Sequence, residues 1–291
     1  MAATGRGGAL AAVGWTIAFL ALAWILAGLF GFGFAWLITG SVHAVPAWIR
    51  TVSGLSLLVQ GVAFLLAALV ATWLIGIKAA KLDLVALRWT AAGSALRGGG
   101  WGVLAGGLAA AAALLLAVVA TPSGWSNDAG GPIAYLASVT RTGAVLAPAA
   151  MAEEVVFRGV PLVLLAAAFG RGTALVSIAL VFALGHALNP HISGLALGNI
   201  ALAGIFLGLA FYAPGGLWTA FGAHFGWNVT LAALDAPVSG LPFRIPLLDY
   251  DPGGPDWITG GAFGPEGGLA ATLALSLACL VVVRRIRKDE A

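Results

Sequence analysis

Long apolar segments separated by short polar or glycine-rich connections are the dominant pattern of this chain. A membrane-spanning helix needs about 20 mostly apolar residues, and about eight segments approach that length. They predict helices near residues 11–37, 52–77, 101–121, 142–168, 173–188, 194–212, 216–235 and 268–285. The sequence therefore predicts an all-α fold, in which residues 1–291 form a single membrane-embedded domain, a polytopic bundle of about eight transmembrane helices.

The composition strengthens this prediction. Hydrophobic residues make up 61% of the chain and charged residues only 9%, whereas soluble domains carry roughly 25% charged residues. The net charge of +3 does not indicate a nucleic-acid partner, because the basic residues lie beside apolar segments rather than in a domain of their own. The expected partner is the lipid bilayer. The single cysteine, Cys279, excludes an intramolecular disulfide and a cysteine-based zinc site.

The distribution of charge predicts the orientation, because short cytoplasmic loops are enriched in Lys and Arg. Alternation of the predicted helices places these basic residues on one side: Arg6, Lys78, Lys81, Arg88, Arg97, Arg171, Arg284, Arg285, Arg287 and Lys288. The other side receives Asp128, Asp235, Asp249, Asp251, Asp256 and Glu266, together with Arg50, Arg141 and Arg244. We therefore expect a multi-pass protein of the cell membrane with both termini in the cytoplasm.

Glycines recur at a four-residue spacing in the predicted helices 194–212 and 216–235, for example Gly222 and Gly226. Small residues at this spacing let helix backbones approach closely in lipid. We expect these two helices to pack tightly beside the functional site.

Two carboxylates and an arginine stand inside the predicted helix 142–168, where ionisable side chains are costly and often functional. Glu154 and Arg158 are four residues apart, the favourable order for an intrahelical ion pair that neutralises itself. Glu153 points about 100° away around the helix, so this pair does not satisfy it. Glu153 is therefore a candidate general base, and Glu154 and Arg158 are candidate supporting residues.

Two histidines lie among apolar residues in other predicted helices, His186 in 173–188 and His224 in 216–235. Asn228 is four residues after His224, so both side chains project from one helix face. An imidazole and a carboxamide placed in this way can hydrogen-bond the oxyanion of a tetrahedral intermediate, or hold a metal ion and its water. His191 follows Pro190 past a helix end, and we expect it to be interfacial.

Signatures of other intramembrane proteases are missing from the sequence. It contains no His-Glu-x-x-His pair and no Gly-x-Ser-x-Gly elbow. Asp249-Tyr250-Asp251 lies in a polar loop rather than on two facing helices, which disfavours an aspartyl protease. A glutamate with histidines is the remaining chemistry.

The motifs Glu-Glu-x-x-x-Arg, Phe-x-x-x-His and His-x-x-x-Asn, in this order on separate helices, resemble those of the CPBP family, the CAAX-processing and bacteriocin-processing (Abi) membrane proteases. The resemblance covers about residues 142–236, the expected catalytic core. It implies that Glu153 and His186 activate the attacking water. It further implies that His224 and Asn228 stabilise the oxyanion, with Glu154 and Arg158 at the remaining motif positions.

The sequence thus predicts an integral membrane endopeptidase that hydrolyses a peptide bond in an intramembrane cavity. Its substrate would be a peptide or protein, lipidated or membrane-associated. Glu153, His186 and His224 could ligate Zn²⁺ with an open position, as in a metalloprotease, and a metal-free mechanism uses the same residues. The alternatives are a non-catalytic membrane scaffold or bacteriocin self-immunity protein and, less favoured, a proton-coupled transporter.

The depth of the predicted site does not decide from which side of the membrane the site is accessible. Glu153 lies about 11 residues, or about 16 Å, from Thr142 and so near mid-membrane, whereas His186 lies closer to the outer surface. Either the predicted boundaries are displaced by a turn, or the cavity opens outward. An outward opening would disfavour a cytoplasmic prenylated tail as the substrate.

Overall fold

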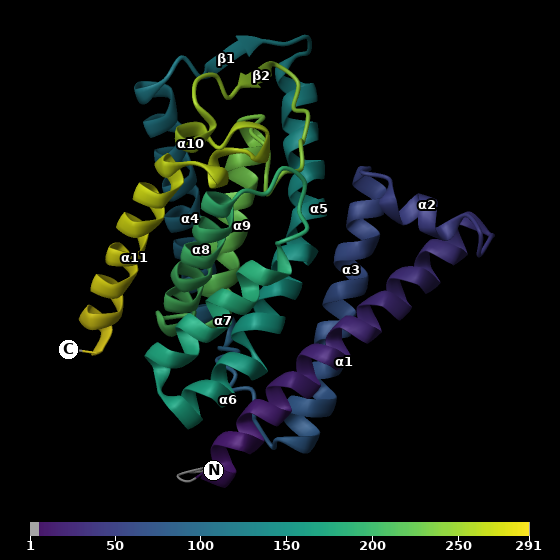
Figure 1. Ribbon diagram of the computed structural model, residues 1–291, viewed down its shortest axis with the longest axis vertical. Coiled ribbons are helices and arrows are strands. Elements are labelled where there is room, and N and C mark those ends of the chain that lie inside the picture. The colour runs from purple at the N-terminus through teal and green to yellow at the C-terminus, as the bar shows by residue number, and fades with distance from the viewer. Residues whose placement is uncertain (1–5, 291) are drawn as a thin grey trace. The chain divides into compact units, whose positions relative to one another are not determined.

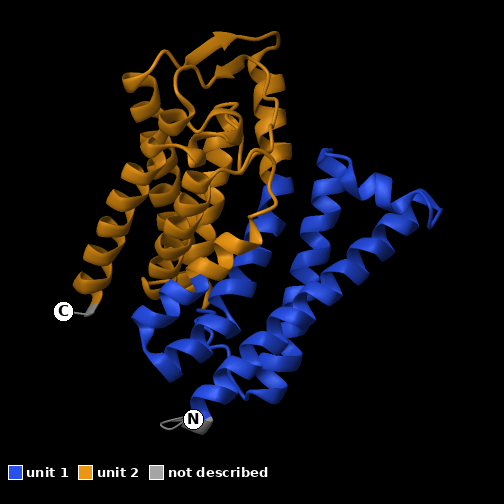
Figure 2. Cartoon of the chain, in the orientation of Figure 1, with its two compact units in different colours: residues 1–90, 144–178 blue, residues 91–143, 179–291 orange. Residues whose placement is uncertain are grey.

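A computed structural model describes residues 6–290, which are mostly helical (Figure 1). The chain divides into two compact units (Figure 2). Unit 1 contains residues 1–90 and 144–178, and unit 2 contains residues 91–143 and 179–291. The predicted all-α membrane fold agrees with this helical content.

Unit 1 is built around two long apolar helices that pack against each other, α1 (Arg6–Thr39) and α3 (Gly54–Ala71). Trp24 of α1 stacks on Phe64 of α3 with ring centroids 5.1 Å apart. Ser53 caps α3 by accepting a hydrogen bond from the Ser56 backbone N–H at 3.2 Å. The unit also contains α2 (Val45–Arg50), the π-helical η1 (Thr72–Ala79), the end of α5 (Pro132–Arg158), α6 (Val160–Phe169) and the start of α7 (Arg171–Gly185).

The prediction of one continuous helix over 142–168 was wrong, because the chain breaks at Gly159 between α5 and α6. Gly159 has φ −74° and ψ −121°, outside the helical region. A Cβ atom there would lie 2.3 Å from the Val155 carbonyl oxygen, so the break requires glycine. Pro161 is the second residue of the next helix, in the first turn, where its missing N–H costs nothing. Helix α5 therefore ends directly after Arg158.

Unit 2 contains four long helices, α4 (Ala92–Ala120), α8 (Gly194–Tyr212), α9 (Leu217–Ala233) and α11 (Leu269–Glu290). Helix α4 packs on α9 and α11, and α8 packs on the same two helices. The shorter elements are β1 (Gly124–Asn127), β2 (Leu248–Asp251), α10 (Asp256–Thr259), η2 (Gly261–Phe263) and η3 (Pro265–Gly267). Strands β1 and β2 pair antiparallel, with Trp125 opposite Tyr250.

One end of unit 2, which we call the hairpin end, is formed by residues 121–131 and 234–268. The Trp125 indole donates a hydrogen bond to the Leu234 carbonyl at 2.7 Å, which joins β1 to the end of α9. Asp235 accepts backbone hydrogen bonds from Ile245 at 2.7 Å and Tyr250 at 3.2 Å. Burial raises the pKa of Asp235, and these two hydrogen bonds oppose that rise. These contacts give the hairpin end a defined structure.

The glycines of α9 face α4, a partner that the sequence did not identify. A Cβ atom on Gly222 would lie 2.2 Å from the Gly99 carbonyl oxygen, and one on Gly226 would lie 2.3 Å from that of Val103. Conversely, a Cβ atom on Gly106 of α4 would lie 1.9 Å from the Ala223 carbonyl oxygen of α9. Helix α8 also contacts α9, but the closest backbone approach is between α4 and α9.

Replacing Gly106 by valine is expected to lower the stability of the protein by about 1–3 kcal/mol, because the added atoms overlap the α9 backbone. Gly100→Val is the matched control, since a Cβ there meets nothing within 4 Å. The melting temperature in detergent measures both variants. Equal melting temperatures for the two variants would contradict the α4–α9 packing.

Among residues 6–290, five helices are long and apolar enough to cross a membrane: Gly8–Thr39, Gly54–Ala79, Ala92–Ala120, Gly194–Tyr212 and Leu269–Asp289. Helix α7 is apolar but shorter. Helix α9 has only 17 residues, and α5 carries charges in its last turns, so neither is among these five helices. A membrane protein is therefore supported, and the predicted count of about eight spans is not confirmed.

Candidate functional site

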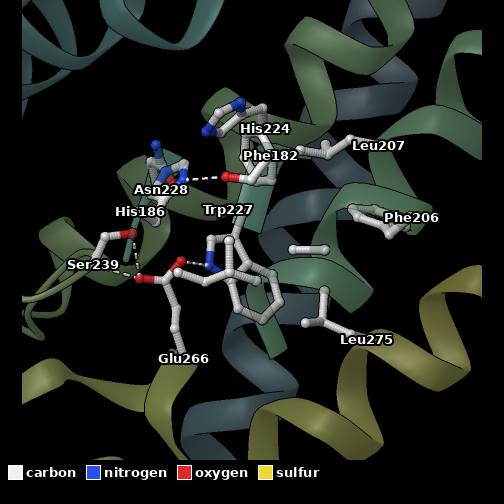
Figure 3. A pocket seen from close by; sticks show the side chains of 12 residues that line it. Phe182, His186, Phe206, Leu207, His224, Trp227, Asn228, Ser239, Glu266 and Leu275 are labelled. Carbon is white, nitrogen blue, oxygen red and sulfur yellow. Dashed lines mark hydrogen bonds between the residues drawn. The ribbon is translucent and has the colours of Figure 1, made fainter. Parts of the chain in front are cut away.

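A pocket in unit 2 brings together three of the predicted catalytic residues, His186, His224 and Asn228 (Figure 3). Its cavity offers about 30 Å³ to the centres of water molecules, which is room for about two waters. The other polar lining residues are Trp227, Ser239 and Glu266, and apolar side chains of α7, α8 and α11 complete the wall. The pocket therefore combines a polar cluster with an apolar surface.

His186 lies in the turn that follows α7, just outside the helix rather than within the predicted helix 173–188. Its Nδ1 atom is 2.8 Å from the Phe182 carbonyl oxygen. A carbonyl oxygen only accepts hydrogen bonds, so Nδ1 carries the proton and donates it. In the neutral ring the lone pair is then on Nε2, the nitrogen that can accept a proton.

His224 and Asn228 reach the pocket from one face of α9, as their four-residue spacing predicts. The His224 side chain is buried, and Asn228 is partly buried. The Phe182 ring lies against both imidazoles, with centroid distances of 4.6 Å to His186 and 6.2 Å to His224. This buried aromatic contact fixes the two rings at the same pocket wall.

Glu266 is a pocket residue that the sequence analysis missed. It lies in η3 and is 9% exposed. One carboxylate oxygen accepts a hydrogen bond from the Trp227 indole at 3.1 Å, and the other accepts from the Ser239 backbone N–H and from its hydroxyl at 3.0 Å (Figure 3). Burial raises the pKa of Glu266, and the hydrogen bonds from Ser239 and Trp227 and the electrostatic effect of the nearby His186 oppose that rise.

The segment that carries Glu266 is clamped to α8. The Asn199 side-chain amide donates hydrogen bonds to the carbonyl oxygens of Glu266 and Gly268, both at 2.8 Å. Its own oxygen accepts a hydrogen bond from the Thr272 hydroxyl at 2.6 Å. Asn199 is 2% exposed, so this link between α8, η3 and α11 is shielded from water. The clamp holds the Glu266 carboxylate in a fixed position.

Replacing Glu266 by alanine is expected to lower the melting temperature, because it leaves the buried donors of Trp227 and Ser239 without an acceptor. Each such donor costs about 1–3 kcal/mol. Activity should fall as well, since Trp227 precedes Asn228 on α9. Asp249→Ala, which removes an exposed acid of β2, is the control. An unchanged melting temperature for Glu266→Ala would contradict this role.

Glu153, Glu154 and Arg158 lie in the last turns of α5, in unit 1. The predicted ion pair is confirmed: an Arg158 guanidinium nitrogen lies 3.1 Å from a Glu154 carboxylate oxygen, and both side chains are fully buried. Glu153 is partly buried. The catalytic role predicted for Glu153 stays a prediction, as do the roles of the other site residues.

Within each unit, the described residues contain no group of three or more His, Cys, Asp or Glu side chains placed to hold a metal ion. The predicted ligand set of Glu153, His186 and His224 draws on both units. It stays a prediction, and so does the choice between zinc and a metal-free site.

Comparisons with known proteins give one family match. Residues 134–230 match the family described as type II CAAX prenyl endopeptidase Rce1-like. Neither the search of curated proteins nor that of solved structures returned a match. The matched segment runs from the start of α5 into α9 and contains all three predicted motifs. The resemblance predicted from the motifs is thereby confirmed: over residues 134–230 the chain matches the Rce1-like family of type II CAAX prenyl endopeptidases.

Proposed function

We propose that the chain is an integral membrane endopeptidase that hydrolyses a peptide bond of a membrane-associated substrate. The observation that carries the proposal is that two imidazoles and a carboxamide from the matched segment line one pocket. The buried setting is suited to catalysis, because fixed donors act more strongly where water is largely excluded.

In the proposed first step, Glu153 and His186 together take a proton from a water molecule whose oxygen attacks the scissile carbonyl carbon. The assigned tautomer supports this role for His186, since its Nε2 is the basic nitrogen. The carbonyl oxygen becomes an oxyanion, which accepts hydrogen bonds from His224 and Asn228. When the intermediate collapses, the C–N bond breaks and the proton passes to the leaving amine. The products are a new carboxyl end and a new amino end.

A covalent route through Ser239 is the main mechanistic alternative within the pocket. Its hydroxyl donates to the buried Glu266 carboxylate at 3.0 Å, and a carboxylate can act as a base toward a serine. Direct water attack predicts that Ser239→Ala keeps its activity within about fivefold, since it removes one hydrogen bond worth about 1 kcal/mol. A loss of 100-fold or more would favour an acyl-enzyme instead.

The proposed function is tested with purified protein in proteoliposomes that contain solubilised membrane proteins as substrates. Cleavage in H₂¹⁸O should place ¹⁸O in the new carboxyl ends, which mass spectrometry detects. Glu153→Gln proteoliposomes are the control for contaminating proteases. Turnover by the purified protein would exclude the scaffold, immunity and transporter alternatives, and the absence of any Glu153-dependent ends would overturn the proposal. Metal analysis and chelator inhibition of the same sample distinguish the zinc and metal-free mechanisms.

A further inference from the structure

The long helices of unit 2 place its loops at two opposite ends. At the end away from the hairpin, Trp101 near the start of α4, Pro214 between α8 and α9, and Arg285 near the end of α11 line one cleft. The Arg285 guanidinium carbon lies 4.7 Å from the centre of the Trp101 ring. The start of α4, the connection between α8 and α9, and the last turns of α11 therefore meet at this end, which we call the basic end.

The basic residues of unit 2 are concentrated at the basic end. They are Arg97, Arg284, Arg285, Arg287 and Lys288, whereas Arg244 lies at the hairpin end and Arg141 on α5. Five of the basic residues of unit 2 thus lie at the basic end, and two lie elsewhere. The acidic residues of the hairpin end are Asp128, Asp235, Asp249, Asp251, Asp256 and Glu266, and those of the basic end are Asp289 and Glu290. Because short cytoplasmic loops of membrane proteins are enriched in Lys and Arg, we assign the basic end to the cytoplasmic side of the membrane.

The catalytic pocket lies toward the hairpin end. Ser239 and Glu266 belong to the hairpin-end loops themselves. Asn228 is five residues before the end of α9, or about 7.5 Å along the helix axis, whereas Arg285 is 16 residues past the start of α11, or about 24 Å. Nearly the whole apolar length of α11 therefore separates η3, where Glu266 lies, from the basic end.

We propose that the pocket opens to the side of the membrane away from the cytoplasm. Its substrates are then outward-facing segments of membrane-anchored or exported proteins, rather than lipidated tails in the cytoplasm. The substrate class rests on the proposed endopeptidase function, whereas the orientation of the pocket does not. Of the two explanations that the sequence left open for the depth of the site, this orientation selects the outward opening.

The orientation is tested by labelling single cysteines on intact cells with a membrane-impermeant maleimide. Cys279→Ser removes the only native thiol. In that background, Asp251→Cys introduces an exposed thiol at the hairpin end and Arg287→Cys one at the basic end. The Asp251→Cys variant should be labelled at least tenfold more than the Arg287→Cys variant. Permeabilised cells should label both, which controls for thiol reactivity. The reverse pattern on intact cells would overturn the inference.

The substrate class is tested separately by mapping the new chain ends that depend on Glu153 onto the topology of each cleaved protein. Cleavage sites outside the cytoplasm are expected. Glu153-dependent sites confined to cytoplasmic segments would overturn the inference and leave the endopeptidase function intact. If no Glu153-dependent ends exist, both the proposed endopeptidase function and the proposed substrate class are overturned. The thiol labelling then still decides the orientation of unit 2.

Discussion

Glu153→Gln is expected to lower the rate of peptide hydrolysis by about 10²–10⁴-fold, the range attributed to a positioned general base. The glutamine side chain has nearly the same size but cannot accept a proton from water, so the attacking nucleophile is not generated. The measurement is the initial rate of formation of new chain ends by purified protein in proteoliposomes. The effect should appear mainly in kcat, because proton removal belongs to the transition state rather than to substrate binding.

This result has meaning only if the variant protein folds. Its melting temperature and its yield from the membrane fraction should match those of the unsubstituted protein within experimental error. Asp249→Asn makes the same acid-to-amide change at an exposed position of β2, and it should keep full activity. Full activity in Glu153→Gln would remove the general base from the mechanism.

His186→Ala is expected to reduce the same rate by a similar factor of about 10²–10⁴. The imidazole has a fixed tautomer, because Nδ1 donates to the Phe182 carbonyl oxygen at 2.8 Å. Its removal deletes the basic Nε2 together with this anchoring hydrogen bond. The double variant with Glu153→Gln should lose little more than either single variant, since residues that act as one unit are strongly non-additive.

His191 provides the matched control for His186, five residues away in the same connection. Its side chain is exposed and its backbone adopts a left-handed conformation with φ 59°. His191→Ala should keep activity within about twofold, since it is an exposed surface substitution. Equal losses in the two variants would show that the connection, rather than the His186 imidazole, matters for activity.

Local patterns made part of the site predictable from the sequence. The four-residue spacing of His224 and Asn228 placed both on one face of α9, and both line the pocket. The same spacing predicted the buried pair of Glu154 and Arg158. Such patterns depend only on the geometry of one helix, which is the same in every protein. For the same reason, long apolar segments predicted the membrane helices.

Features that depend on contacts between distant segments were missed. In the sequence, Glu266 is one of several acidic residues in a polar segment. Its place in the pocket results from contacts with Trp227, Ser239 and Asn199, which are distant in the sequence. The close partner of α9, helix α4, was not identified from the sequence, because glycine spacing shows that a helix can be approached but not by which neighbour. The break after Arg158 was also missed, although Gly159 and Pro161 are residues that typically mark the end of one helix and the start of the next.

Cleavage of peptide bonds by Glu153 and His186 is tested by comparing the peptide ends in membranes of cells that carry different variants. Mass spectrometry would identify the ends in membranes with the unsubstituted protein, Glu153→Gln, His186→Ala and His191→Ala. We expect one set of new ends that is shared by the unsubstituted protein and His191→Ala and is missing from Glu153→Gln and His186→Ala. Identical sets of ends in all four membranes would contradict it.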